Sequence, residues 1–251
     1  MINYPPDGMR AQMERGEVQV WWGDPSSMRA EHLRDKEGVL PEEERAAIAR
    51  FVFAEDRRTA LLTRLMVRHV LSRVCGSLSP DRWVFGRNAH GRPFIANPGF
   101  EWIEFNISHC RTLVVCALAT RARLGVDVEP LERRAPVELA ERYFAPSEAA
   151  DVRRAPPALQ PIRFLRYWTL KESYIKARGK GLSIPLESFA FRLSGVEPRA
   201  VLAEAADDDV TSWQFWLDEL HATHVLALAY APEDDVTLSL RLHPVETLLA
   251  G

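Results

Sequence analysis

The sequence predicts an α+β protein of two similar halves with a cleft between them. Each half contains helical patterns together with strand patterns that alternate polar and apolar residues. The halves also resemble each other, because residues 104–119 and residues 215–229 both read as an apolar hairpin whose first strand ends at a histidine. This duplication predicts a division into residues 1–122 and 123–251. Clefts between domains are common ligand sites.

The first half is expected to begin with a polar lead-in over the first fifteen or so residues and then a strand at 17–22. A helix is predicted from Pro41 to Val74, because a proline followed by glutamates suits the positively polarised first turn of a helix. Gly76 is expected to end this segment. Short strands are predicted at residues 82–85, 102–107 and 113–119.

The second half is expected to open with a strand at 124–129, which Pro130 stops. Its longest helix is predicted at 162–178, where large apolar residues recur at steps of three and four. The other elements predicted here are helices at 137–144 and 147–154 and strands at 188–193, 212–219 and 225–230.

Composition narrows the class of protein. The chain has 251 residues, a net charge of −3 and 47% hydrophobic residues, which is typical of a globular protein without a strongly basic face for nucleic acid. It contains no run of about 18 apolar residues and no signal-peptide core, so we expect a cytoplasmic protein that does not bind membranes. Cys75, Cys110 and Cys116 are too scattered for a disulfide framework or a zinc site. We also expect a monomer.

The strand at 124–129 carries two carboxylates on one face. Strand side chains alternate, so Val126 and Val128 share one side while Asp127 and Glu129 share the other. Two such charges are costly unless they are solvated or neutralised, and Mg²⁺ prefers carboxylate oxygens together with substrate phosphates. The alternative is a solvated outer face with two ordinary surface acids, which is the commoner arrangement for an acidic pair taken alone.

Lysine is scarce in this chain and is concentrated around the end of the predicted helix 162–178. Only four of the 32 Lys and Arg residues are lysines, and Lys171, Lys176 and Lys180 lie within ten residues of one another. Glu172 and Lys176 are four residues apart, which makes them neighbours on the helix surface. A compact, flexible ammonium suits a phosphate contact, whereas the alternative is an exposed Glu–Lys pair that only stabilises the helix.

Polar side chains also gather at the end of the predicted strand 102–107. Ser108 and His109 follow its last apolar residue and could reach a ligand there. A serine or cysteine hydrolase is a poor explanation, because Ser108, His109 and Cys110 are consecutive and diverge, and no Gly-x-Ser-x-Gly elbow occurs. The alternative for His109 is a structural histidine.

Arginines on the first long helix and in one loop form a third set of polar candidates. No Walker phosphate loop and no Gly-x-Gly-x-x-Gly fingerprint accompanies them. The alternative is that most of them are solvated surface charges. The residues are Arg57, Arg58, Arg64 and Arg68 on the helix and Arg92 in the loop Gly91-Arg92-Pro93.

The order and spacing of these motifs resemble those of the Sfp-type 4′-phosphopantetheinyl transferases over nearly the whole chain. Phe-Asn-Ile-Ser-His is followed about twenty residues later by Gly-Val-Asp-Val-Glu, and then by Trp-x-x-Lys-Glu-Ser-x-x-Lys-x-x-Gly-x-Gly. The upstream Gly-Arg-Pro is similar to the Gly-Lys-Pro of that family. Members of the family transfer the phosphopantetheine arm of coenzyme A to a serine of an acyl, peptidyl or aryl carrier protein and release adenosine 3′,5′-bisphosphate.

The resemblance implies an active site in the cleft between the two halves. Asp127, Glu129 and Glu172 of the C-terminal half would hold Mg²⁺ against the diphosphate of coenzyme A. Glu172, or a water beside it, would take the serine proton. Lys176 would contact the diphosphate and stabilise the leaving group, with Lys171 supporting it nearby.

The resemblance also assigns the coenzyme A contacts of the N-terminal half. Ser108 and His109 would contact phosphate, and Arg58 and Arg92 the adenosine-phosphate end. The chain departs from the family pattern at the start of its first helix, where Glu42-Glu43-Glu44 replaces the usual early lysines. The candidates to replace those lysines at the 3′-phosphate are Arg45, Arg50 and Arg57.

The segment from Pro130 to Val137 is expected to form part of the carrier-docking surface. It joins Arg133 and Arg134 to apolar residues, and carrier proteins of this kind are generally acidic; the alternative is an ordinary polar loop. Two other functions stay open at this point. One is a non-catalytic module that binds coenzyme A or a carrier protein, and the other is a metal-dependent hydrolase of the coenzyme A diphosphate.

Overall fold

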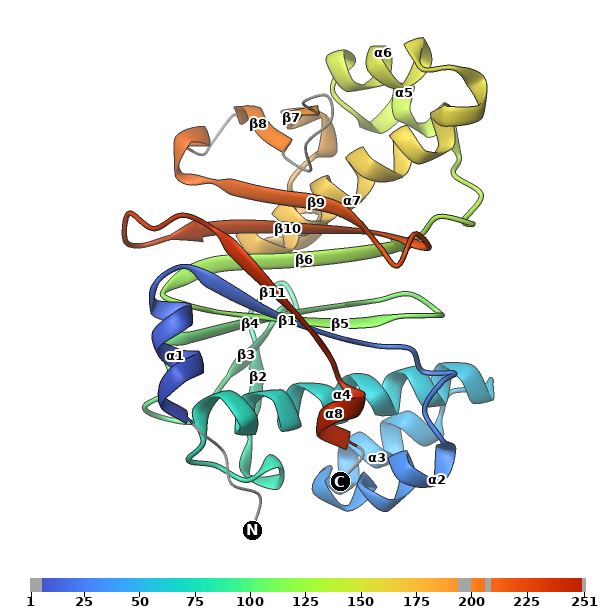
Figure 1. The fold of residues 1–251 in the computed structure, drawn as a ribbon. Helices are drawn as coiled ribbons and strands as arrows, with labels where there is room; N and C mark the ends of the chain where they lie inside the picture. The colour runs from blue at the N-terminus through green and yellow to red at the C-terminus, as the bar shows by residue number, and fades with distance from the viewer. Residues whose placement is uncertain (1–5, 194–199, 206–208, 250–251) are drawn as a thin grey trace. The chain divides into compact units, whose positions relative to one another are not determined.

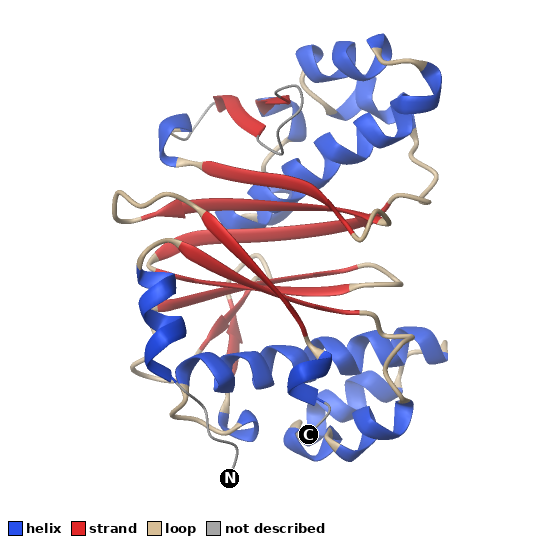
Figure 2. Ribbon diagram, in the orientation of Figure 1, coloured by secondary structure: helices blue, strands red, loops and turns tan. Residues whose placement is uncertain are grey.

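The computed structural model describes residues 6–193, 200–205 and 209–249, and the chain divides into two compact units. The N-terminal unit comprises residues 1–86, 93–121 and 239–251, and the C-terminal unit comprises residues 87–92 and 122–238. Each unit combines a mainly antiparallel sheet with a long helix packed against it (Figures 1 and 2). The predicted α+β class is therefore confirmed.

The N-terminal unit contains a four-stranded sheet in the order β11-β1-β5-β4, and helix α4 packs on it. The β4 and β5 strands form the first predicted hairpin, while β11 runs parallel to β1. The apolar side of α4 faces the sheet, and Gly76 ends the helix in the left-handed conformation as predicted. The sheet strands and this helix are β1 (Glu17–Gly23), β4 (Ile103–His109), β5 (Val114–Thr120), β11 (Ser239–Pro244) and α4 (Ala54–Cys75).

Three expectations for this unit were wrong. The strand predicted at 82–85 is replaced by a 3-10 helix at Pro80–Arg82, and the observed strand begins only at Phe85. The predicted helix 41–74 is interrupted at 50–53, where Phe53 is extended and the Arg57 guanidinium binds the carbonyl oxygens of Phe51 and Val52 at 2.7 and 3.0 Å. The polar lead-in contains a helix, in which Arg10 and Glu14 pair one turn apart at 3.0 Å. The helices of this unit besides α4 are α1 (Pro6–Glu14), α2 (Ala30–Asp35), α3 (Glu42–Ala49) and α8 (Glu246–Leu249).

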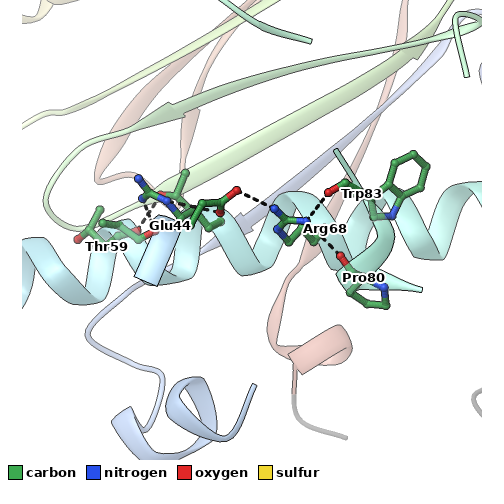
Figure 3. Close-up of polar contacts among 8 residues, drawn as sticks. Glu44, Thr59, Arg68, Pro80 and Trp83 are labelled. Atoms are coloured by element: carbon green, nitrogen blue, oxygen red, sulfur yellow. Dashed lines mark hydrogen bonds and ion pairs between the residues drawn. The ribbon is translucent and has the colours of Figure 1, made fainter. Parts of the chain in front are cut away.

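A buried arginine holds α3 onto α4 (Figure 3). Arg68 is 1% exposed, and its guanidinium lies 2.6 Å from Glu44 Oε1 and donates to the carbonyl of Trp83 at 2.6 Å. Glu44 also lies 3.7 Å from the Arg64 guanidinium. Arg64 and Arg68 are therefore balanced by one of the glutamates that begin α3, so their first role is structural.

The C-terminal unit contains a three-stranded antiparallel sheet in the order β6-β10-β9, and α7 packs on β6 and β10. The core lies between this sheet and α7 and is rich in aromatic residues. A short hairpin of β7 and β8 packs beside it. The elements are β6 (Ala122–Pro130), α5 (Ala140–Tyr143), α6 (Pro146–Arg154), α7 (Gln160–Arg178), β7 (Phe189–Leu193), β8 (Ala200–Ala205), β9 (Gln214–Leu220) and β10 (His224–Pro232).

The observed division differs from the predicted one, 1–122 and 123–251, in two segments. Strand β11 belongs to the N-terminal sheet, because it pairs with β1 over six residue positions from Glu17 to Trp22. Residues 87–92 belong to the C-terminal unit. They form the tip of a hairpin whose strands are β2 (Phe85–Arg87) and β3 (Pro93–Ile95).

Helix α7 lies in direct backbone contact with β6 at Gly125. A Cβ atom at this position would lie 1.9 Å from the carbonyl oxygen of Ser173 and 2.5 Å from the amide nitrogen of Ala177. Both distances are too short for any side chain, so glycine is required here. None of the described helices is long and apolar enough to cross a membrane.

Gly125→Ala should push α7 away from β6. Overpacking of a buried contact costs about 1–3 kcal/mol, and backbone atoms cannot move aside as a side chain would, so the free energy of unfolding in urea should fall by at least this amount. Gly38→Ala is the matched control, because a Cβ at Gly38 meets nothing within 4 Å. Equal stability of the two variants would contradict the contact.

Candidate active site

The acidic face of β6 points toward α7. Gly125 touches α7, and side chains two residues apart on a strand share a face, so Asp127 and Glu129 lie on the same side. Asp127 is 6% exposed, and its Oδ1 lies 2.6 Å from the Nζ atom of Lys176. The alternative of a solvated outer face is therefore wrong for Asp127.

Helix α7 adds a third carboxylate to this place. Glu172 lies one turn before Lys176, and burial raises the pKa of Glu172 above its ordinary value. The charge on Asp127 raises this pKa further, Lys176 opposes the shift, and the charge on Glu129 adds to it. The charges of Asp127 and Glu129 both act on Glu172, so the three carboxylates are close enough to repel one another.

Glu129 is held by a side chain that the motifs did not single out for it. The Arg133 guanidinium binds Glu129 Oε1 and lies 5.8 Å from the centre of the Trp168 ring. Burial raises the pKa of Glu129, and the hydrogen bond from Arg133 acts against that shift. Arg133 and Arg134, which were both expected on the carrier-docking surface, are both exposed.

The chemistry of this donor set fits a hard divalent cation. Three carboxylates supply only oxygen atoms, and their mutual repulsion is what a cation such as Mg²⁺ would relieve. Within the described ranges no three acidic, histidine or cysteine side chains are already arranged around a metal position. Two of the three carboxylates instead hold cationic side chains, Lys176 on Asp127 and Arg133 on Glu129.

Lys171 does not join this cluster, although we expected it to support Lys176. Its side chain is 0% exposed and lies 2.7 Å from Oε2 of Glu148, which is equally buried. Its Nζ also donates to the carbonyl oxygens of Leu186 and Phe189 at 2.8 and 2.7 Å. Burial lowers the pKa of Lys171, and the charge of Glu148 opposes that shift. Lys171 is therefore a core residue that fixes α7 to α6 and β7.

The Arg92 guanidinium binds backbone at the end of α7. It donates to the carbonyl oxygens of Lys176 and Ala177, the latter at 3.1 Å, and to that of Leu124 on β6 at 3.0 Å. Asn88 of the same hairpin tip donates to the carbonyl of Gly179 at 2.9 Å. These bonds satisfy carbonyl groups that a helix end leaves unpaired, so the tip holds α7 in place.

The other predicted contacts belong to the N-terminal unit. Ser108 is buried on β4, and His109 is exposed at the end of that strand. Arg58 lies in the second turn of α4 and is half-buried. Among the described residues it has no ion pair or side-chain hydrogen bond, in contrast to Arg57, Arg64 and Arg68.

Comparison with known proteins places the chain in a family. Residues 123–229 match the 4′-phosphopantetheinyl transferase superfamily, and residues 25–121 match the 4′-phosphopantetheinyl transferase, N-terminal, family. The 4′-phosphopantetheinyl transferase HetI of Nostoc sp. is 33% identical over 179 residues, which cover 70% of this chain and 75% of that protein. This chain belongs to the 4′-phosphopantetheinyl transferase superfamily. The family resemblance drawn from the motifs is thereby confirmed.

Two further members of the superfamily show how far the likeness extends. The 4′-phosphopantetheinyl transferase Sfp of Bacillus subtilis is 36% identical over 60% of this chain, and the match spans 65% of the Sfp length. The L-aminoadipate-semialdehyde dehydrogenase-phosphopantetheinyl transferase of Xenopus laevis is 30% identical over 82% of this chain and 72% of its own length. The matched part of this transferase-family chain therefore includes both units.

Several residues of the site escaped the motif analysis. Gly125 could have been found, because a glycine inside an apolar strand pattern indicates a bulge or a close backbone approach. Glu148, the partner of Lys171, occupies the third position of α6 and accepts a hydrogen bond from the amide of Ala145 at 3.1 Å. Pro146 with a glutamate two residues later indicates a helix start in the sequence, whereas the pairing of Glu148 with Lys171 depends on tertiary packing.

Lys171→Met should destabilise the fold, because it leaves Glu148 buried without its counter-charge. Breaking a buried ion pair costs about 3–5 kcal/mol, and urea unfolding should show a loss of this size. The double variant Lys171→Met/Glu148→Gln should recover part of the loss, while Lys180→Met at the exposed end of the motif should change stability by less than about 0.5 kcal/mol. A stable Lys171→Met variant without transferase activity would instead favour a catalytic lysine.

Arg92→Lys should loosen the last turn of α7. An ammonium keeps the charge but cannot reproduce the fork that reaches carbonyl groups on two elements, so the free energy of unfolding should fall by about 1–2 kcal/mol. Amide hydrogen exchange in residues 175–179 should become faster. Arg87→Lys is the control, because Arg87 is exposed and its guanidinium bonds the carbonyl of Gly91 in its own loop. If the amide hydrogen exchange of residues 175–179 were unchanged in Arg92→Lys, Arg92 would not hold the last turn of α7.

Proposed function

We propose that this protein transfers the 4′-phosphopantetheine arm of coenzyme A to a serine hydroxyl of an acyl, peptidyl or aryl carrier protein. The serine oxygen forms a bond to the phosphorus that carries pantetheine, the bond from this phosphorus to the bridging diphosphate oxygen breaks, and adenosine 3′,5′-bisphosphate leaves. The observation that carries the proposal is the gathering of Asp127, Glu129, Glu172 and Lys176 in a chain of this superfamily.

Asp127, Glu129 and Glu172 are the residues that would hold Mg²⁺. When bound, Mg²⁺ supplies charge neutralisation at the diphosphate, which is the main requirement of phosphoryl-type transfer. Glu172, or a water beside it, is the proposed acceptor of the serine proton. While no metal is bound, burial raises the pKa of Glu172 above its ordinary value, and the charges of Asp127 and Glu129 add to that shift.

Lys176 is the proposed contact to the diphosphate. Its side chain is partly exposed, and a lysine side chain has enough rotatable bonds to turn from Asp127 to a bound phosphate. Ser108, His109 and Arg58 stay the proposed phosphate contacts of the N-terminal unit. For Arg92 and Lys171 the hydrogen bonds described above support a role in fixing α7, not in contacting substrate.

The direct test mixes the purified protein with coenzyme A, Mg²⁺ and a panel of apo carrier proteins, and follows the mass of each carrier. A phosphopantetheine increment on a carrier serine is the expected result. Release of free phosphopantetheine without a modified carrier would indicate a hydrolase. No change on any carrier, with a working transferase in parallel, would indicate a binding module and overturn the proposal.

Glu172→Gln and Asp127→Ala should each lower kcat/KM for carrier modification by about a hundredfold or more, because general acid–base catalysis contributes about 10²–10⁴-fold and the metal site needs its charges. Glu187→Gln is the control, since Glu187 is an exposed glutamate of the same unit. Urea unfolding should show that Glu172→Gln is folded. A Glu172→Gln variant with nearly full activity would exclude this residue as base and ligand.

A further inference from the structure

The carboxylate cluster carries its own counter-ions. Lys176 on Asp127 comes from α7 and has a proposed task at the diphosphate. Arg133 on Glu129 has no assigned role at the metal or the diphosphate, and its expected role in carrier docking does not account for its contact with Glu129. The Arg133 guanidinium nevertheless holds a defined position against Glu129.

Three contacts place the Arg133 guanidinium against Glu129. The chain turns directly after β6, where the amide of Leu131 donates to the carbonyl of Thr223 at 2.8 Å and the amide of Arg133 donates to that of Pro130 at 3.0 Å. The guanidinium then lies 5.8 Å from the ring centre of Trp168 on α7.

The Arg133 side chain is more exposed to solvent than the Glu129 side chain that it binds. The Glu129 side chain is 14% exposed, whereas the Arg133 side chain is 42% exposed. The arginine therefore lies on the solvent side of the acid. A guanidinium stays protonated at every physiological pH, so any other cation reaches Glu129 against a permanent positive charge.

We propose that Arg133 competes with the divalent cation for Glu129 and is displaced from it when the cation binds. The inference rests on the proposed function, because it takes Glu129 as a ligand of that cation. Arg133 would balance the three acids while no metal is bound and would weaken metal binding by the same interaction. Lys176 would make the corresponding exchange at Asp127.

Mn²⁺ binding to the full-length protein tests the exchange. Free Mn²⁺ is followed by electron paramagnetic resonance at fixed ionic strength, with and without saturating coenzyme A. Arg133→Gln should lower the Kd for Mn²⁺ by about two- to fivefold, the size expected from losing one partly exposed charge. Arg134→Gln is the matched control and should leave the Kd unchanged, because Arg134 is an exposed arginine that, unlike Arg133, is not among the groups acting on Glu129 or Glu172.

A double-mutant comparison shows whether the effect passes through Glu129. In a Glu129→Gln background, Arg133→Gln should no longer change the Kd, because the contested carboxylate is gone. An unchanged or raised Kd in Arg133→Gln alone would overturn the inference. If Glu172→Gln abolishes Mn²⁺ binding while Arg133→Gln does not tighten it, only the exchange fails. If the parent protein binds no Mn²⁺ under either condition, the metal part of the proposed function fails as well.

Discussion

The backbone contact between α7 and β6 at Gly125 determines where every charge of the candidate site lies. Ser173 and Ala177 occupy the space that a side chain at residue 125 would need, so the helix lies directly on the strand. Asp127 and Glu129 follow on the same face of β6, and Glu172 and Lys176 are on the adjoining turns of α7. Because Gly125 has no side chain, the two carboxylates of β6 lie beside the carboxylate and the ammonium of α7.

The two lysines of α7 show how burial decides what an ion pair can do. The pair of Lys171 and Glu148 is closed to solvent and is completed by backbone groups, so separating it would leave two charges in an apolar core. The pair of Lys176 and Asp127 is open on the lysine side. Its ammonium can exchange one anion for another at little cost. The first pair is therefore suited to holding the helix, and the second to meeting a ligand.

The sequence predicted those parts of the molecule that follow from periodicity and from local motifs. The acidic strand face and the ridge of Glu172 and Lys176 are set by side-chain spacing alone. In contrast, we expected Lys171 to support Lys176 because lysine is scarce elsewhere in the chain. Five residues turn a helix by about 140°, so the two lysines lie on different faces of α7. The Arg92 guanidinium reaches carbonyl groups 84 and 85 residues away along the chain, and no local pattern encodes such a contact. The break at 50–53 contains neither glycine nor proline and is held by the side chain of Arg57.

The chain path has a consequence for how the protein is made. Strand β11 completes the N-terminal sheet, although more than a hundred residues of the C-terminal unit separate it from the rest of that sheet. The hairpin tip that holds the end of α7 is, conversely, synthesised long before α7 itself. Neither unit is a continuous stretch of chain, so a cut near residue 121 would remove an integral piece from each. Folding on the ribosome therefore cannot proceed as two successive domains: the N-terminal sheet stays open at β1 until residues 239–244 have emerged.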